Sequence, residues 1–296
     1  MKVTVLIPSY NHSKYIAQAI NSVLDQTWKD IDLIVVDDSS TDDSVLIINS
    51  ILNERGGFQF IANKKNSGLI SSLNAGLRLA EGEYFCQLAS DDFLPQDSLK
   101  KRAEYLTKNP GYVAVYTDGI SFKGSQVEEG TPLYGTKRRS LFQKDDPIPM
   151  MLEGISPVFA TGMFRTEVLR NLGGFDPVYR CYEDLEMPLL LCRSGKIGFL
   201  DDKVFCRREH ETNTSSTTSS IRTDKILFYN KIIRNPLFSK YKSKINKQLR
   251  RSYLALGRHL TRYDGGSVYE RDLFKKAWFY VLQDLRLLYH LIKWGR

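Results

Sequence analysis

A strand and helix pattern repeated near the start of the chain constrains its fold more than any other feature. Short runs of β-branched and other apolar residues alternate with stretches of helical spacing. The predicted strands are 3–7, 33–36, 58–61, 84–88 and 113–116, and helices begin near residues 16, 42 and 69. Strands that are apolar on nearly every residue and alternate with helices form a parallel sheet buried on both faces. The sequence therefore predicts a Rossmann-like α/β domain.

Length and cysteine usage limit the class of protein. A chain of 296 residues, 42% hydrophobic, can bury one substantial core with a smaller appended element. The four cysteines form no CxxC pair and are too scattered for a disulfide framework or a thiolate metal site, which favours a reducing cytosol. The first residues enter a strand pattern directly, without the regions of a signal peptide, and no apolar run is long enough to span a bilayer. We therefore expect a cytoplasmic protein.

Positive charge is concentrated at the end of the chain. Residues 221–296 contain 18 Lys and Arg against 5 Asp and Glu, whereas the whole chain contains 42 against 34. A body with excess acid followed by a strongly basic segment indicates that the segment meets an anionic surface such as lipid headgroups or nucleic acid.

Acidic and polar residues follow several predicted strands. Ligands of open α/β sheets bind beyond the carboxyl ends of the strands. Asp91 and Asp92 follow the fourth strand, where paired carboxylates can hold Mg²⁺ or Mn²⁺ against phosphate oxygens. The alternative is helix capping, since Asp is favoured at helix starts and Pro95 follows.

Asp37 and Asp38 follow the second strand in the segment DDSSTD. We expect Ser40 or Thr41 to cap the next helix. A carboxylate at this edge can also accept the ring N–H of uracil or thymine. The rival interpretation is a phosphoacceptor site as in receiver domains, which are much shorter and lack the later acidic motifs.

Five motifs occur in one order along the chain: VLIPSYN, IVVDDSSTDDS, KKNSGLISSLNAGLRLAEGEYFCQLASDDFLPQDSL, GGFDP and YEDLEMPLLLCRSGKIGFL. On these motifs the chain resembles family 2 (GT2) of the GT-A glycosyltransferases, over about residues 3–215. The resemblance implies a GT-A fold, with a mixed sheet flanked by helices, and the basic, amphipathic end of the chain indicates a C-terminal helical extension. The predicted parts are a catalytic domain at 1–220, divided into a nucleotide-sugar-binding half at 1–118 and an acceptor-side half at 119–220, and a basic amphipathic extension at 221–296.

The resemblance also implies which residues contact the nucleotide-sugar donor, with UDP as the default nucleotide. Asp38 stands where the family reads the base, and Asp37 looks structural. Leu73 replaces an Arg that often precedes the second Asn of the family's NxGxxxxxNxG loop. The implied donor-binding residues are Pro8, Tyr10, Asn11, Asp38, Asn66, Gly68, Asn74 and Asp91.

The implied cofactor is Mn²⁺ or Mg²⁺. Asp92 is the expected direct ligand, while Asp91 is expected to reach the sugar or ribose. Ala89 stands where many relatives carry another carboxylate. His210 lies in a segment similar to the family's RxHxxNxS and would complete the metal shell, although a lone His is usually not a ligand.

Glu183 and Asp184 occupy the position of the family's catalytic acidic pair. The resemblance implies that Asp184 is the general base, which takes the proton of the acceptor hydroxyl in a single displacement with inversion. The structural alternative is that the pair complements the dipole of the helix that follows.

The last part of the chain, 265–296, has an apolar helical face with Lys and Arg elsewhere on the helix. It either packs on the body or holds the enzyme on the inner, anionic face of the cell membrane. The second interpretation suits a lipid-linked or other saccharide acceptor in bacterial surface polysaccharide (O-antigen or capsule) synthesis.

Two other functions fit parts of the sequence. A nucleotidyltransferase that makes nucleotide-sugars also needs an α/β nucleotide site and a carboxylate-bound metal, but normally has a Gly-rich basic loop where this chain has PSYNHSKY. A nucleic-acid-binding protein would use the basic tail on phosphates, but that function leaves the acidic motifs unexplained.

Overall fold

A computed structural model describes the chain except residues 125–126, 180–181, 211–217 and 263–296. The chain divides into two compact units: Met1–Pro177 with Glu183–Asn213, and Val178–Tyr182 with Thr214–Arg296. The predicted amphipathic segment at 265–296 lies outside the described residues. Among the helices that are described, none combines the length and apolar composition needed to cross a bilayer.

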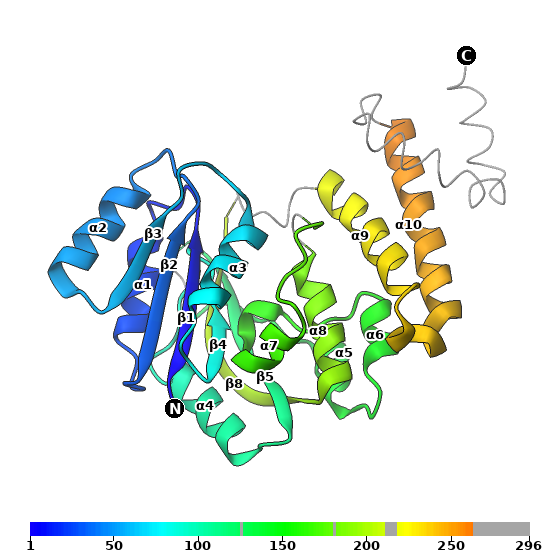
Figure 1. Cartoon of the computed structure of the whole chain (residues 1–296), viewed down its shortest axis with the longest axis horizontal. Helices are drawn as coiled ribbons and strands as arrows, with labels where there is room; N and C mark the ends of the chain where they lie inside the picture. Colours follow the sequence, from blue (N-terminus) through cyan, green and yellow to red (C-terminus); the bar gives the residue numbers. More distant parts are fainter. Residues whose placement is uncertain (125–126, 180–181, 211–217, 263–296) are drawn as a thin grey trace. The chain divides into compact units, whose positions relative to one another are not determined.

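The first unit begins with the predicted alternation of strands and helices (Figure 1). Its elements in this part are β1 (Val3–Ser9), α1 (Ile16–Leu24), β2 (Ile31–Asp37), α2 (Ser44–Arg55), β3 (Phe58–Ala62), α3 (Leu69–Leu79), β4 (Tyr84–Gln87) and α4 (Ser98–Lys108). β3, β2, β1 and β4 are adjacent in that order and all parallel. The expectation of a parallel sheet in this half is confirmed.

The second part of this unit extends the sheet with strands of both directions. Its elements are β5 (Tyr112–Lys123), β6 (Thr131–Pro132), α5 (Thr136–Arg139), η1 (Ser140–Gln143), α6 (Ile148–Leu152), η2 (Phe159–Thr161), β7 (Gly162–Arg165), α7 (Thr166–Asn171), α8 (Glu183–Ser194) and β8 (Lys196–Glu209). β7 lies antiparallel between β4 and β5, and β8 pairs parallel with β5. The mixed sheet predicted from the family resemblance is therefore present.

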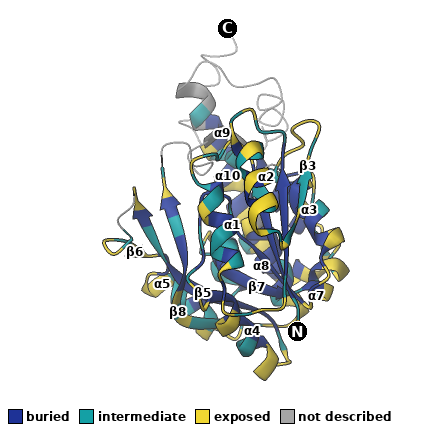
Figure 2. Cartoon of the chain, turned by 90° about the vertical axis from the view of Figure 1, so that its left-hand side faces the viewer, coloured by how far each residue is buried: buried dark blue, intermediate teal, exposed yellow. Residues whose placement is uncertain are grey.

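Apolar side chains cover both faces of the sheet. Along β1, Val3, Val5 and Ile7 belong to a core with α1, α2 and α4, whereas Leu6 belongs to a second core with α3, α7 and α8. Successive side chains of a strand point to opposite faces, so a strand between two helical layers must be apolar at nearly every position. β1, β2 and β4 are accordingly among the most buried parts of the chain (Figure 2).

The second unit contains α9 (Thr218–Ile232), η4 (Pro236–Tyr241) and α10 (Lys242–Arg262). Ile226, Phe228 and Ile232 of α9 are buried, as are Ile245 and Leu249 of α10. The two helices contact each other, and Asn230 Nδ2 of α9 donates to Tyr253 Oη of α10 at 3.0 Å. The part of the predicted extension that the structure describes, up to Arg262, is largely helical.

Candidate active site

The loops that follow β1, β2 and β4 meet at one edge of the sheet. Ser9, the last residue of β1, pairs with Asp37, the last of β2, so both strands end at the same level. Asn11 joins the two loops, because its amide N donates to Ser40 Oγ at 2.8 Å and its side-chain oxygen accepts from Thr41 N at 2.8 Å. Asn11 adopts a positive φ of 54° in this turn. This predicted donor residue therefore also holds the first two loops together.

Asp37 has a structural role. Its carboxylate is fully buried and accepts hydrogen bonds from Ser9 Oγ, Ser40 N and Ser40 Oγ. The helix cap predicted at Ser40 or Thr41 is wrong, because α2 begins at Ser44 and the Ser40 hydroxyl is bound to Asp37.

Asp38 anchors the loop before α3. It accepts from Asn63 Nδ2 at 2.9 Å, from Ser67 N at 2.9 Å and from Gly68 N at 2.7 Å. Gly68 has φ of 86°, a value that favours glycine, and Asn66 of the same loop is exposed. Asp38 thus fixes the position of a loop that contains two of the predicted donor-binding residues.

The remaining predicted donor-binding residues in this region lie in β1, directly after it and in α3. Pro8 is half-buried within β1, and Tyr10 beside it is 44% exposed. The side-chain amide of Asn74 makes two hydrogen bonds with the backbone of Phe175. Asn74 Nδ2 donates to the Phe175 carbonyl oxygen at 2.7 Å, and Asn74 Oδ1 accepts from the Phe175 amide N at 2.9 Å. Asn74 therefore fixes the Gly173–Gly174–Phe175 turn to α3, a structural role that the sequence did not indicate.

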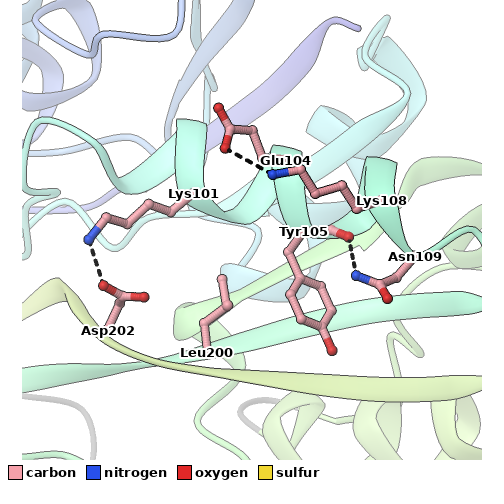
Figure 3. Close-up of a pocket in the computed structure, with 7 residues that line it drawn as sticks. All are labelled: Lys101, Glu104, Tyr105, Lys108, Asn109, Leu200 and Asp202. Atoms are coloured by element: carbon pink, nitrogen blue, oxygen red, sulfur yellow. Dashed lines mark hydrogen bonds and ion pairs between the residues drawn. The ribbon is translucent and has the colours of Figure 1, made fainter.

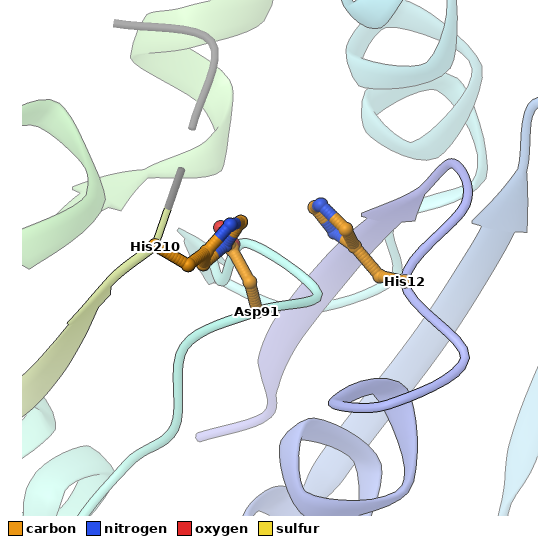
Figure 4. Close-up of side chains that lie close together, drawn as sticks. All are labelled: His12, Asp91 and His210. Atoms are coloured by element: carbon orange, nitrogen blue, oxygen red, sulfur yellow. The ribbon is translucent and has the colours of Figure 1, made fainter. Parts of the chain in front are cut away.

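Three side chains from separate loops form a candidate metal centre. His12 follows β1, Asp91 follows β4 and His210 follows β8 (Figure 4). Their potential ligand atoms all lie within 4.8 Å of one another, and His210 Nε2 is 2.9 Å from Asp91 Oδ2. Tyr15 stacks on the His210 ring with centroids 5.0 Å apart. Imidazole nitrogens and a carboxylate oxygen are suitable ligands for Mn²⁺ and related cations, so these residues fit the expected metal.

His12 was not predicted as a site residue, although its position directly after PSYN at a strand end was a usable signal. Burial lowers the pKa of His12 and the neighbouring His210 lowers it further, while Asp91 opposes the change. Burial therefore favours the neutral imidazole, which is the form that binds a metal.

Asp91 and Asp92 are not helix caps, since α4 begins at Ser98. Asp91 faces His210, whereas Asp92 lies outside this three-residue cluster and accepts from Arg208 N at 2.8 Å. Burial, and then the negative charge of Asp91, raise the pKa of Asp92 well above its usual range. This geometry differs from the sequence-based assignment, in which Asp92 was the direct metal ligand and Asp91 contacted sugar or ribose.

Asp184 lies in the first turn of α8, with Glu183 as the first residue of that helix. Asp184 is exposed at the surface, although desolvation by the nearby protein raises the pKa of Asp184 to about 6. Arg207 and Arg138 act in the opposite direction. The Arg207 charge also lowers the pKa of Asp92, so one guanidinium lies within electrostatic range of both carboxyls.

A separate surface pocket lies between α4 and β8. It has a volume of about 240 Å³ and is lined by Lys101, Glu104, Tyr105, Lys108, Asn109, Leu200 and Asp202 (Figure 3). Lys101 Nζ and Asp202 Oδ1 form an ion pair at 2.5 Å. None of the predicted site residues lines this pocket.

Comparison with known proteins decides the family. Residues 4–172 match the model of glycosyl transferase family 2. The chain belongs to this family. It is therefore a glycosyltransferase, and neither alternative from the sequence, a nucleotidyltransferase or a nucleic-acid-binding protein, is needed to explain its acidic motifs.

Relatives of this family 2 enzyme include synthases of bacterial polysaccharides. A chondroitin synthase from Escherichia coli is 30% identical over 217 residues, which are 72% of this chain and 30% of that protein. A hyaluronan synthase from Pasteurella multocida is 28% identical over 215 residues, 72% of this chain and 21% of that protein. The chain thus spans less than a third of the length of either synthase.

Solved structures of similar fold support the GT-A architecture of the enzyme. S. aureus TarS in complex with UDP-GlcNAc gives a TM-score of 0.67 at 21% identity, covering 94% of this chain and 79% of that one. The mannosyltransferase PcManGT from Pyrobaculum calidifontis, in complex with GDP-Man and Mn²⁺, gives 0.60 at 19% identity, covering 98% and 84%. At these identities the likeness concerns the fold.

Proposed function

We propose that this enzyme transfers a sugar from a nucleotide-sugar, by default a UDP-sugar, to an acceptor hydroxyl, with a divalent cation and with inversion at the anomeric carbon. The observation that carries the proposal is the pair of Asp91 and His210, whose Oδ2 and Nε2 atoms lie 2.9 Å apart at the edge of the sheet where α/β folds bind nucleotides. TarS and PcManGT were solved with nucleotide-sugars, and PcManGT also with Mn²⁺.

In this proposal Asp91 and His210 hold the cation, which when bound offsets the negative charge that develops on the leaving nucleoside diphosphate. Asp38 and Asn11 keep the loops of the donor site in place through the hydrogen bonds described above. Pro8, Tyr10 and the loop with Asn66 and Gly68 border the donor.

Asp184 is the proposed general base. A base works best when its pKa lies near the working pH, because it is then ionised and still accepts a proton readily. The pKa of about 6 at Asp184 meets this condition. Attack by the deprotonated acceptor oxygen in one displacement needs no covalent intermediate and inverts the anomeric configuration. Glu183, the neighbouring residue, is the second member of the proposed catalytic pair.

The direct test is transfer by an Asp184→Asn variant. We expect transfer to fall by at least about 10²-fold, the usual range for a lost general base, while donor binding measured by calorimetry stays nearly unchanged. Asp202→Asn, in the pocket beside α4, is the matched control and keeps its activity. Full turnover by Asp184→Asn, or a product of retained anomeric configuration in NMR spectra, contradicts the proposal.

We infer further that the acceptor is a saccharide or lipid-linked saccharide of a bacterial surface polysaccharide. The named relatives that synthesise chondroitin and hyaluronan support this substrate class. A panel of UDP-glucose, UDP-galactose, UDP-N-acetylhexosamines and dTDP-rhamnose, with metal-dependent release of nucleotide as readout, identifies the donor.

Membrane contact through the second unit is also proposed. The exposed side chains Lys242, Lys247, Arg250 and Arg251 of α10 give this helix a basic surface. Basic residues near a bilayer contribute about 1 kcal/mol each on an anionic leaflet. This surface and the segment 265–296 together would place the enzyme on the inner face of the cell membrane.

A further inference from the structure

The backbone around His12 is held in place by the first residue of α2 and by the loop that precedes this helix. The His12 amide N donates to Ser44 Oγ at 3.1 Å, and on either side of it Asn11 N donates to Ser40 Oγ and Ser13 N to Asp42 Oδ2. Three successive amides are therefore anchored to this neighbouring segment. The imidazole is projected from a fixed backbone, as a pre-organised ligand requires.

The spacing of the three side chains fits a single ion. An octahedral ion about 2.1 Å from each ligand atom separates neighbouring ligand atoms by about 3.0 Å and opposite ones by about 4.2 Å. Asp91 Oδ2 and His210 Nε2, 2.9 Å apart, already have the spacing of neighbours. The other separations are within 4.8 Å, so they exceed the opposite-ligand distance by at most about 0.6 Å.

The hydrogen bond of His12 selects the nitrogen that could bind the ion. His12 Nδ1 lies 2.7 Å from Ser90 Oγ. When Nδ1 carries the proton and donates to Ser90, Nε2 keeps its lone pair. Histidines that bind metals almost always donate their other ring N–H to an oxygen in this way, which fixes the tautomer and the ring orientation.

We propose that His12 is a third protein ligand of the divalent cation, together with Asp91 and His210. This inference rests on the proposed metal-dependent transfer and adds the composition of the metal centre: two imidazoles and one carboxylate on one ion. Imidazole suits first-row transition metals, whereas Mg²⁺ prefers oxygen ligands. The centre therefore selects Mn²⁺, Co²⁺ or a similar ion over Mg²⁺, with His12 as a determinant of that selectivity.

The test measures metal binding to the full chain without donor. Co²⁺ is titrated while its visible absorption is recorded, and Mg²⁺ affinity is measured by competition. We expect His12→Gln to weaken Co²⁺ binding by at least the roughly 10- to 100-fold typical of losing an outer-shell partner, and to change the absorption spectrum because an imidazole nitrogen leaves the ion. Mg²⁺ affinity should change by less than about threefold, because the amide oxygen of Gln is a ligand that Mg²⁺ accepts.

Two control variants separate ligation from a structural role. Ser90→Ala removes the partner of Nδ1 but keeps the imidazole, so its Co²⁺ spectrum should resemble that of the unmodified chain. His259→Gln, in α10, should leave both affinity and spectrum unchanged. Unchanged Co²⁺ affinity and spectrum in His12→Gln overturn the proposal, as does the same spectral change in Ser90→Ala as in His12→Gln, or the absence of saturable Co²⁺ binding to the unmodified chain.

A measurement on the unmodified chain tests the proposal without depending on the folding of any variant. With ¹⁵N-labelled histidine and bound Mn²⁺, electron spin-echo modulation counts the imidazoles on the ion. Two coordinated imidazoles are expected, and one overturns the role of His12. A count of one leaves the proposed sugar transfer standing, because that proposal needs only Asp91 and His210, and its own test is the activity of Asp184→Asn.

Discussion

The pH dependence of sugar transfer tests the environment of Asp184 quantitatively. With a pKa of about 6, about one-tenth of this carboxyl is ionised at pH 5 and about nine-tenths at pH 7. Because only the ionised form accepts the acceptor proton, kcat/KM should rise about tenfold over this interval. A carboxyl with the ordinary Asp pKa of about 3.9 is already more than nine-tenths ionised at pH 5, so its rate would barely change.

A variant of Arg138 tests whether the pKa of Asp184 sets the pH dependence of transfer. Arg138 lowers the pKa of Asp184, so Arg138→Gln should raise that pKa and move the acidic limb of the profile to higher pH. Arg139→Gln is the matched control, because Arg139 is paired with Asp118 and Asp201. The assay is the initial rate of nucleotide release from pH 4.5 to 8 at saturating Mn²⁺. An acidic limb near pH 4, or a limb that Arg138→Gln does not move, refutes the assignment of Asp184 as a base of raised pKa.

Three further perturbations have defined outcomes. Asp91→Asn should weaken the Mn²⁺ dependence of donor binding by at least about tenfold, measured by calorimetry with and without metal, and equal metal dependence contradicts its role as a ligand. Gly174→Ala should destabilise the fold by about 1–3 kcal/mol, because Gly174 has φ of +73° and its new Cβ would lie 2.7 Å from Asn74 Oδ1. Thermal melts test this against Gly111→Ala, where a Cβ meets nothing within 4 Å, and equal melting temperatures refute it. Replacing Arg250 and Arg251 by Glu should reduce sedimentation with anionic liposomes but not with neutral ones, and unchanged sedimentation argues against membrane contact by α10.

Much of the nucleotide-binding half could be predicted from its sequence. The apolar runs at 3–7 and 33–36 became neighbouring parallel strands, since a strand covered on both faces must be apolar throughout. The strand ends that carry Asp37 and Asp91 were located for the same reason. Ligands of such sheets bind at that edge. Locating the strand ends from the periodicity of the sequence therefore also located the candidate site.

The partners of individual side chains could not be predicted from spacing. Asp91 and Asp92 are adjacent and chemically identical, and the geometry alone turns the first toward His210 and the second toward Arg208 N. His12 was overlooked, because its two partners in the cluster lie far along the sequence. The side-chain amide of Asn74 bonds to the backbone of Phe175, about one hundred positions along the chain, a contact that the spacing of the loop motif did not indicate.

The sequence by itself determined the strand and helix order of the nucleotide-binding half, the family and the set of acidic motifs, because these depend on local patterns of polarity and on residue identity. Only the tertiary structure decided which of those polar groups face one another. Contacts such as that between His12 Nδ1 and Ser90 Oγ join residues 78 positions apart. Their formation depends on how sheet edges and loops pack, and side-chain direction is fixed there by hydrogen bonds that no linear pattern encodes.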